Sequence, residues 1–292
     1  MTEAAARLRK PVLRPPEKHQ LGYNNILLPP DQVATEEVIN EAAALLKLSA
    51  ENVRELMSQS VPMPVARTAS REEAELVSAR LRDLGLDCLT VGDGELGLSF
   101  SDNSVKRVRS MTFDDERVTI YQAGAAEVTE AAWAGIVLIV PGRLFERRLE
   151  IKERKTRKTE NEILDTSEFF KDETVIDFYL ARHSSTWRVS AAGFDFSCLG
   201  REKALVANEN IGKLQRLIVS KAVNAQVDDS YVRMRNLLEL AWGTQTETQP
   251  GGWRREGPGK LSVGVATTTS NESQFTRYSR LRYCLGFKTS DL

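Results

Sequence analysis

Residues 70–91 read Ser-Arg-Glu-Glu-Ala-Glu-Leu-Val-Ser-Ala-Arg-Leu-Arg-Asp-Leu-Gly-Leu-Asp-Cys-Leu-Thr-Val, and they decide the fold of the first part of the chain. The stretch opens with a capping box, in which Ser70 and Glu73 bond to free amides at a helix start. Apolar residues then recur at helical spacing, and Gly85 is typical of a helix C-terminus. The alternating residues 86–91 predict a strand. We therefore expect a helix that turns directly into a strand.

The sequence before this stretch predicts two more helices and two more strands. Strands are expected at residues 23–28 and 65–68, where short apolar runs are bounded by proline or polar residues. Helices are expected at 35–46 and 49–58, each with a Thr or Ser at its first residue that can act as N-cap. The order strand, helix, helix, strand, helix, strand predicts a small α+β domain over residues 21–100.

Residues 48–57 together with 70–91 resemble the C-terminal domain of the bacterial ribosomal stalk protein, whose fold is shared by the Clp-protease adaptor family. The resemblance covers roughly a quarter of the chain and implies the fold. The residues that give these families their functions have no counterparts. The basic first helix of the stalk domain is matched by Glu36, Glu37, Asn40 and Glu41, and the recognition residues of the adaptors by Pro29, Pro30, Asp31, Ser58, Gln59 and Ser60. We expect neither function here, because a fold does not imply a function.

Residues 101–242 predict a mostly antiparallel β domain with closing helices. Strands are expected at 105–113, 117–123, 135–140, 144–154, 162–169, 175–181, 187–191 and 194–197, and helices at 208–223 and 231–242. Turn residues separate many of the strands, among them Pro141 and Gly142. Sequential strands followed by a helix resemble a pleckstrin-homology-like domain, and Trp133 ahead of a strand resembles a pattern of its bacterial members. The predicted fold class is α+β.

The two ends of the chain differ from these domains. Residues 1–20 predict an extended basic arm, with five basic and two acidic residues and several prolines. Residues 243–292 predict a linker rich in Gly, Thr, Gln and Pro, followed by an amphipathic helix from about residue 271. The apolar face of this helix is predicted to bind a partner through Phe275, Tyr278, Leu281 and Leu285. Packing of the helix on its own chain stays open as the alternative.

Composition narrows the classes of function. The chain has 40 basic and 41 acidic residues and a net charge of -1, so we expect no nucleic-acid partner. Its three cysteines lie far apart and form no CxxC pair, which indicates reduced thiols rather than a disulfide framework. No apolar run in the sequence is long enough to span a bilayer, and the first residues lack a secretory signal. We expect a cytoplasmic protein, with a place at the periphery of a membrane complex as a further expectation.

No motif in the sequence indicates a catalytic centre. Residues 92–97 match the spacing GxGxxG, but no helical pattern follows, so a link between domains is favoured over a phosphate-binding loop. The two histidines, His19 and His183, lie far apart, and His183 is favoured as a turn residue. Cys198 lies between apolar residues and is favoured as a buried thiol. We expect no catalytic residue, no cofactor and no metal site.

Residues 143–158 form the most basic run of the chain, in which glutamates alternate with Arg and Lys. In pleckstrin-like domains such a hairpin can receive anionic lipid headgroups. The candidates for anion or lipid binding are Arg147, Arg148, Arg154 and Lys155. The interleaved glutamates weaken the positive field, so a solvated hairpin is favoured.

Together these observations predict a non-catalytic protein–protein interaction module, an accessory or scaffold subunit of a larger complex. Two alternatives stay open. One is a peripheral membrane or lipid-binding module that uses residues 143–158. The other is an enzyme whose site is assembled from scattered carboxylates, which a pocket of perturbed acids would reveal.

Overall fold

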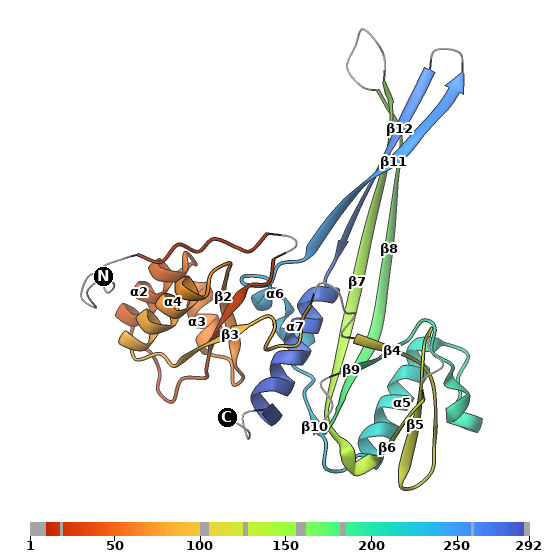
Figure 1. The fold of residues 1–292 in the computed structure, drawn as a ribbon, viewed down its shortest axis with the longest axis horizontal. Coiled ribbons are helices and arrows are strands. Elements are labelled where there is room, and N and C mark those ends of the chain that lie inside the picture. The colour runs from red at the N-terminus through yellow and green to blue at the C-terminus, as the bar shows by residue number, and fades with distance from the viewer. Residues whose placement is uncertain are drawn as a thin grey trace. The chain divides into compact units, whose positions relative to one another are not determined.

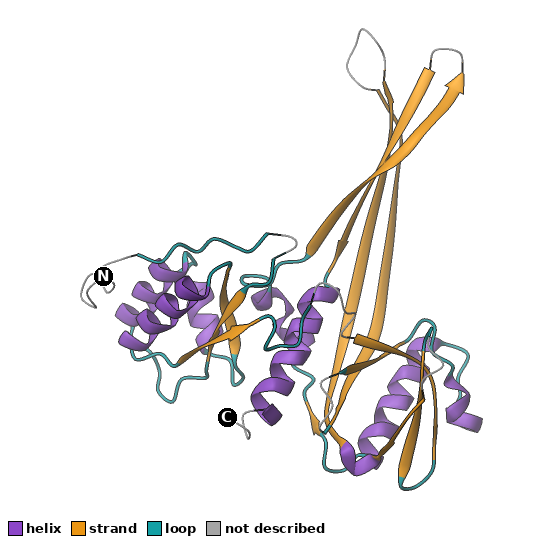
Figure 2. Ribbon diagram, viewed as in Figure 1, coloured by secondary structure: helices purple, strands orange, loops and turns teal. Residues whose placement is uncertain are grey.

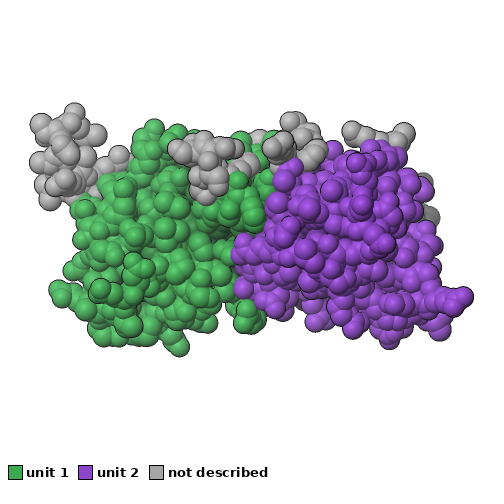
Figure 3. Space-filling model, turned by 90° about the horizontal axis from the view of Figure 1, so that it is seen from below, with its two compact units in different colours: residues 1–104, 233–243, 280–292 green, residues 105–232, 244–279 purple. Residues whose placement is uncertain are grey.

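A computed structural model describes residues 10–17, 20–99, 105–124, 128–155, 162–181, 185–257 and 260–288. The side chains of residues 153–155, 162–164, 252–257, 260–263 and 288 are not described. The chain is mixed α+β and divides into two compact units, coloured separately in Figure 3. Unit 1 contains residues 1–104, 233–243 and 280–292, and unit 2 contains residues 105–232 and 244–279. The boundaries expected at residues 100 and 242 are close to two of the divisions, but the C-terminal segment is shared between the units.

Unit 1 holds a three-stranded antiparallel sheet and three helices that precede or follow its strands (Figure 1). Along the chain these are β1 (Tyr23–Leu27), α2 (Glu36–Leu46), α3 (Ala50–Met57), β2 (Met63–Thr68), α4 (Arg71–Asp83) and β3 (Cys88–Gly92). The three helices begin where the sequence placed their caps, since the side chains of Thr35, Ser49 and Ser70 each accept a bond from the amide three residues on. Strand β1 lies between β2 and β3.

The basic arm expected at residues 1–20 is described for residues 10–17 and 20. These described residues form no helix or strand, and they belong to unit 1. The Val12 amide donates to the Glu73 carboxylate at 2.6 Å, and the Ala69 amide donates to the Arg14 carbonyl at 2.9 Å. These bonds hold the described part of the arm to the same unit that it precedes in sequence.

Unit 2 is built on a nine-stranded sheet with the order β11-β12-β7-β8-β9-β4-β5-β6, and β10 pairs with β7 off this path. The strands are β4 (Val105–Phe113), β5 (Arg117–Gln122), β6 (Val128–Ala132), β7 (Ile136–Lys155), β8 (Glu162–Leu180), β9 (Thr186–Ser190), β10 (Gln226–Val227), β11 (Gln245–Gly257) and β12 (Lys260–Ser270). Most neighbours are antiparallel, but β4 pairs with β9 and β10 with β7 in parallel. Figure 2 shows these strands in orange.

Helix α5 (Ala207–Lys221) packs its apolar face on this sheet. Ile211, Leu214 and Ile218 are buried there beside sheet residues that include Trp187 and Phe178. The remaining helical elements are two 3₁₀ helices (Trp133–Gly135 and Phe196–Glu202), α6 (Tyr231–Leu238), α7 (Glu272–Tyr283) and a π-helix (Cys284–Lys288). The buried apolar residues of unit 2 thus concentrate where α5 meets the sheet.

Two sequence-based expectations for unit 2 are wrong. Residues 243–270 are not a linker, because β11 and β12 form a hairpin whose second strand pairs with β7 over ten residues. The turn expected at Pro141 and Gly142 is also absent. Both residues lie inside β7, where Pro141 is opposite Ile176 of β8. The strands expected at 135–140 and 144–154 are therefore one strand, β7, of 20 residues. The strands expected at 162–169 and 175–181 are likewise one strand, β8, of 19 residues.

Candidate functional site: the four-stranded arm

Four long strands of unit 2 run together beyond the part of the sheet that α5 covers (Figure 1). We define the arm as residues 143–155 of β7, 162–174 of β8, and the strands β11 and β12. Its order is β11-β12-β7-β8. At about 3.3 Å per residue, the 20 residues of β7 extend about 66 Å. The arm is a single sheet layer, and its residues pair with one another in the described ladders.

Cross-strand pairs stabilise the arm in place of an apolar core. Salt bridges between β7 and β8 join Arg143 to Asp172, Arg147 to Glu168 and Lys152 to Asp165, and a further one joins Arg148 to Glu150 within β7. Thr246 and Thr248 of β11 are hydrogen-bonded to Thr269 and Thr267 of β12 at 3.2 and 3.4 Å. The ion-paired side chains are mostly exposed, and each such ion pair is worth only about 0.2–1 kcal/mol. The arm therefore depends mainly on its backbone ladders.

Two phenylalanines are exposed among the described aromatic side chains of the arm. Phe169 is 58% exposed and Phe170 is 65% exposed, and every other aromatic side chain that the structure describes is buried or half-buried. Phe170 stacks on Phe145 of β7 with a centroid distance of 6.4 Å. Apolar rings that lie side by side at a surface, as Phe145 and Phe170 do, are typical of interaction sites. The sequence alone did not single these residues out, although two successive Phe in a strand must point to opposite faces.

Both phenylalanines lie on an edge of the sheet. Residues 162–174 of β8 pair with β7 on one side, whereas only residues 175–179 pair with β9 on the other. The outer edge of β8 along the arm has no partner strand among the described residues. Unpaired strand edges present a row of backbone donors and acceptors to solvent.

The predicted lipid-binding residues do not gather into one positive patch. Arg147 and Arg148 are consecutive in β7 and point to opposite faces, and each is paired with a glutamate. Arg154 and Lys155 belong to the β7 backbone, opposite Ser262 and Leu261 of β12, but their side chains lie outside the described part of the chain.

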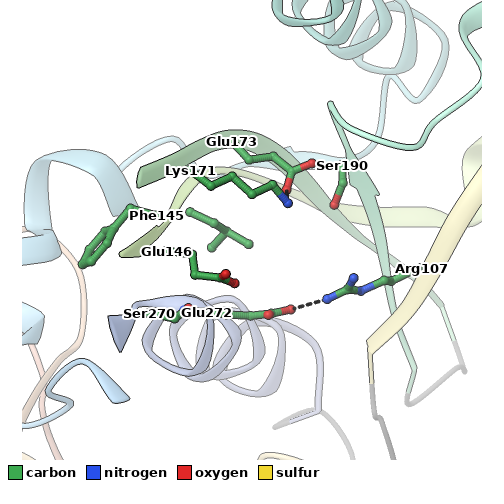
Figure 4. Close-up of a pocket in the computed structure, with 9 residues that line it drawn as sticks. Arg107, Phe145, Glu146, Lys171, Glu173, Ser190, Ser270 and Glu272 are labelled. Atoms are coloured by element: carbon green, nitrogen blue, oxygen red, sulfur yellow. Dashed lines mark hydrogen bonds and ion pairs between the residues drawn. The ribbon is translucent and has the colours of Figure 1, made fainter. Parts of the chain in front are cut away.

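A small polar pocket of about 110 Å³ lies at the base of the arm (Figure 4). It is lined by Arg107, Leu144, Phe145, Glu146, Lys171, Glu173, Ser190, Ser270 and Glu272. Its two cations are paired, Arg107 with Glu272 at 3.2 Å and Lys171 with Glu173 at 2.9 Å. Pockets for small organic ligands usually have volumes of about 300–1,000 Å³ and apolar linings. The pocket is thus too small and too polar for a typical substrate.

The helix predicted to dock on a partner packs on its own chain instead. Phe275, Tyr278 and Leu281 of α7 are all fully buried, and Leu285 is half-buried. The ring of Phe275 lies edge-to-face against that of Tyr231, with their centroids 4.7 Å apart. The Tyr278 hydroxyl donates a hydrogen bond to the Asp228 carboxylate at 3.0 Å. The apolar periodicity was read correctly, but the surface that covers it belongs to the same chain.

A buried ion pair lies beneath α7 in unit 2. Arg188 of β9 donates two hydrogen bonds to Asp177 of β8, at 2.7 and 2.8 Å, and both side chains are almost completely buried. Arg188 also reaches Glu272 and Thr276 of α7 at 3.0 Å each. Burial disfavours the charged guanidinium, but attraction to Asp177 outweighs it and raises the pKa of Arg188. The pair fixes the start of α7 on the sheet.

The structure describes two of the remaining candidates, residues 92–97 and Cys198. Residues 92–97 form a turn with no helix start, in which Gly97 has a φ of 72° and the buried Asp93 accepts bonds from the Gly22 amide and Asn24. Cys198 is half-buried, and burial raises the pKa of its thiol, which disfavours the thiolate that a nucleophile needs. His19 and His183 lie outside the described residues.

The residues that the structure describes contain no group of three or more His, Cys, Asp or Glu side chains arranged to hold a metal ion. None of their helices combines the length and the apolar character that crossing a membrane requires.

Comparison with known proteins gives no relative, since no family model, curated protein or solved structure matches the chain.

Proposed function

We propose that this protein is a non-catalytic interaction protein, an accessory or scaffold subunit that binds another protein through its four-stranded arm. The observation that carries the proposal is the pair Phe169 and Phe170, exposed on the outer edge of a single-layer sheet. Sheets normally gain their stability by burying one face against another element. No described element covers either face of this long arm. This supports a role for the arm as a binding element that a partner protein covers.

The charge of the arm supports a protein partner over a nucleic acid or a lipid surface. The four strands carry ten basic and ten acidic residues, so the arm has no net charge. Binding to phosphates or anionic headgroups relies on an excess of positive charge. The described basic side chains of β7 are already engaged with carboxylates. A protein surface can match such a mixed pattern residue by residue.

The polar pocket gives little support to the alternative of an enzyme. Catalytic acids and bases usually have pKa values shifted by burial or by unpaired charges. The two cations of the pocket, Arg107 and Lys171, are each paired with a glutamate. We therefore place the pocket at the base of the arm as a polar joint between β7, β8 and α7.

The proposal is tested by isolating the full chain from its source and identifying what travels with it. Native purification, sizing and mass spectrometry should show a complex much larger than 32.6 kDa. The double variant Phe169→Thr and Phe170→Thr should release the partner, because it removes the exposed rings and keeps residues that favour strands. The matched control is Glu247→Thr with Gln249→Thr, which places two threonines on the opposite edge of the arm, in β11.

Two results would overturn the proposal. One is a wild-type chain that elutes alone at its own mass under gentle conditions. The other is a partner that stays bound equally well to the phenylalanine variant and to the β11 control. Far-ultraviolet circular dichroism of each variant establishes that the sheet is intact.

A further inference from the structure

The placement of the two exposed rings limits how a partner can cover them. Successive residues in a strand point to opposite faces, so Phe169 lies on one face of the arm and Phe170 on the other. A partner that stacks on one face covers one ring only. A strand that pairs along the outer edge of β8 flanks both faces and reaches both rings. The geometry therefore fits the addition of a strand to the sheet.

The edge itself can receive a strand. Residues 165–172 of β8 pair with β7 on their inner side, and no described strand pairs with their outer side. Alternate amides and carbonyls of an edge strand point outward and can complete a further ladder. Because each added residue pairs at 3.2–3.4 Å intervals, an extended segment of about seven residues spans the region around the two rings.

The charges along this edge define the partner. Residues 162–174 contain five acidic residues and one basic residue, a net charge of -4 (1 − 5). On the face that carries Phe170, the residues two positions away on either side are Glu168 and Asp172. Opposite charges and apolar pairs stabilise facing positions of neighbouring strands. The matching strand has an apolar residue opposite Phe170 and basic residues two positions before and after it.

The ion pairs with β7 leave Glu168 and Asp172 able to bind a basic residue of a partner. Arg147 bonds to Glu168, and Arg143 bonds to Asp172, in pairs whose side chains are mostly exposed. Such pairs are weak, and a carboxylate can accept bonds from two donors at once. A basic residue on an added strand would approach these carboxylates from the side opposite to β7.

A second copy of this chain fits the edge poorly. Pairing β8 with β8 would place two strands of net charge -4 side by side, and like charges opposite each other are destabilising. The other edge, β11, has Glu247 and Pro250 in its paired region, and proline cannot donate to a ladder. Charged edges and proline are means by which proteins avoid joining to themselves.

We infer that the outer edge of β8 around Phe169 and Phe170 receives an extended segment of a partner protein with the pattern basic–x–apolar–x–basic. The inference rests on the proposed function and deepens it by giving the chemistry of the partner.

The test uses the full chain and two labelled peptides. One is Thr-Lys-Val-Phe-Val-Arg-Thr, and its charge-reversed control is Thr-Glu-Val-Phe-Val-Glu-Thr. Fluorescence anisotropy should show the basic peptide binding about tenfold or more tightly than the acidic one, and more weakly as salt rises. Glu168→Gln with Asp172→Asn should weaken binding of the basic peptide about tenfold. Glu150→Gln, which also removes a paired carboxylate of the arm, should leave it unchanged.

Hydrogen exchange separates strand addition from contact through side chains alone. With the basic peptide bound, amides within residues 165–172 should gain protection, while those of β11 should not. Equal binding of the two peptides, equal effects of the β8 variants and the Glu150 control, or no added protection in β8 would each overturn the inference.

The inference and the proposed function can fail separately. If the peptides do not discriminate but Phe169→Thr with Phe170→Thr still releases the native partner, strand addition is refuted and the proposed function stands. If the peptides bind as expected but the native chain elutes alone, the proposed function falls and the strand-binding edge remains.

Discussion

The buried pair of Arg188 and Asp177 gives the sharpest test of how unit 2 is held together. Asp177 accepts three bonds: two from the Arg188 guanidinium and one from the Ser279 hydroxyl at 2.9 Å. Neither charged side chain is exposed by more than 1%. The test compares three variants with the wild type: Asp177→Leu, Arg188→Met, and the double variant that carries both substitutions.

The expected magnitudes follow from burial. Removing one partner leaves the other charge in a low-dielectric site, which costs about 3–5 kcal/mol of the free energy of unfolding. Glu272 offsets a small part of this in Asp177→Leu, because it remains 3.0 Å from Arg188 but is partly exposed. The double variant removes both charges. It should cost far less than the sum of the two single variants, with a coupling of about 2 kcal/mol or more.

Urea unfolding of the three variants and the wild type measures this coupling directly. Far-ultraviolet circular dichroism follows the sheet, and tryptophan fluorescence, to which the buried Trp187 beside Arg188 in β9 contributes, follows the tertiary packing. The reasoning would be refuted by strict additivity, in which the double variant loses as much as the two single variants together. It would equally be refuted by single variants that cost less than about 1 kcal/mol, the value of an exposed pair.

Two other predictions concern packing and pH. Gly142→Ala should destabilise the chain by about 1–3 kcal/mol in urea unfolding, because its Cβ would lie 2.6 and 2.8 Å from ring atoms of the buried Phe275. The control is Gly135→Ala, which should have little effect because no atom lies within 4 Å of its new Cβ. Burial raises the pKa of Cys88 to about 11. Its protonated thiol therefore favours the folded state below the ordinary thiol pKa of 9.0, and this contribution is lost as pH rises from about 9 to about 11. Over that range the free energy of unfolding of the wild type should fall by about 2–3 kcal/mol more than that of Cys88→Ala. A parallel decline of both proteins would contradict this.

The elements of unit 1 were predictable because their signals are local. The caps at Thr35, Ser49 and Ser70 and the glycine after α4 set the helix ends within a few residues of those observed. The strands between them are short and bounded by proline or glycine. Each of these signals acts through neighbours in sequence, so no knowledge of distant contacts is needed.

Unit 2 was harder to predict because its longest strands depend on distant partners. Pro141 and Gly142 favour a turn by themselves, but the ladder between β7 and β8 carries the strand through them, and the Phe275 ring lies against Gly142. The Thr- and Gly-rich residues 243–270 look like a linker until β12 pairs with β7, more than a hundred residues earlier. Strand propensity is set largely by such pairing.

The features of the candidate site likewise divide into those that the sequence predicts and those that depend on the tertiary structure. The sequence by itself determined the basic run of β7 and the apolar periodicity of α7. The tertiary structure decided what these features do: it paired Arg147 and Arg148 with glutamates, buried the face of α7 on its own chain, and left Phe169 and Phe170 on an open edge. Periodicity in the sequence indicates which apolar side chains share one face of an element. Only the pairing and packing of distant elements determines which of those side chains are buried.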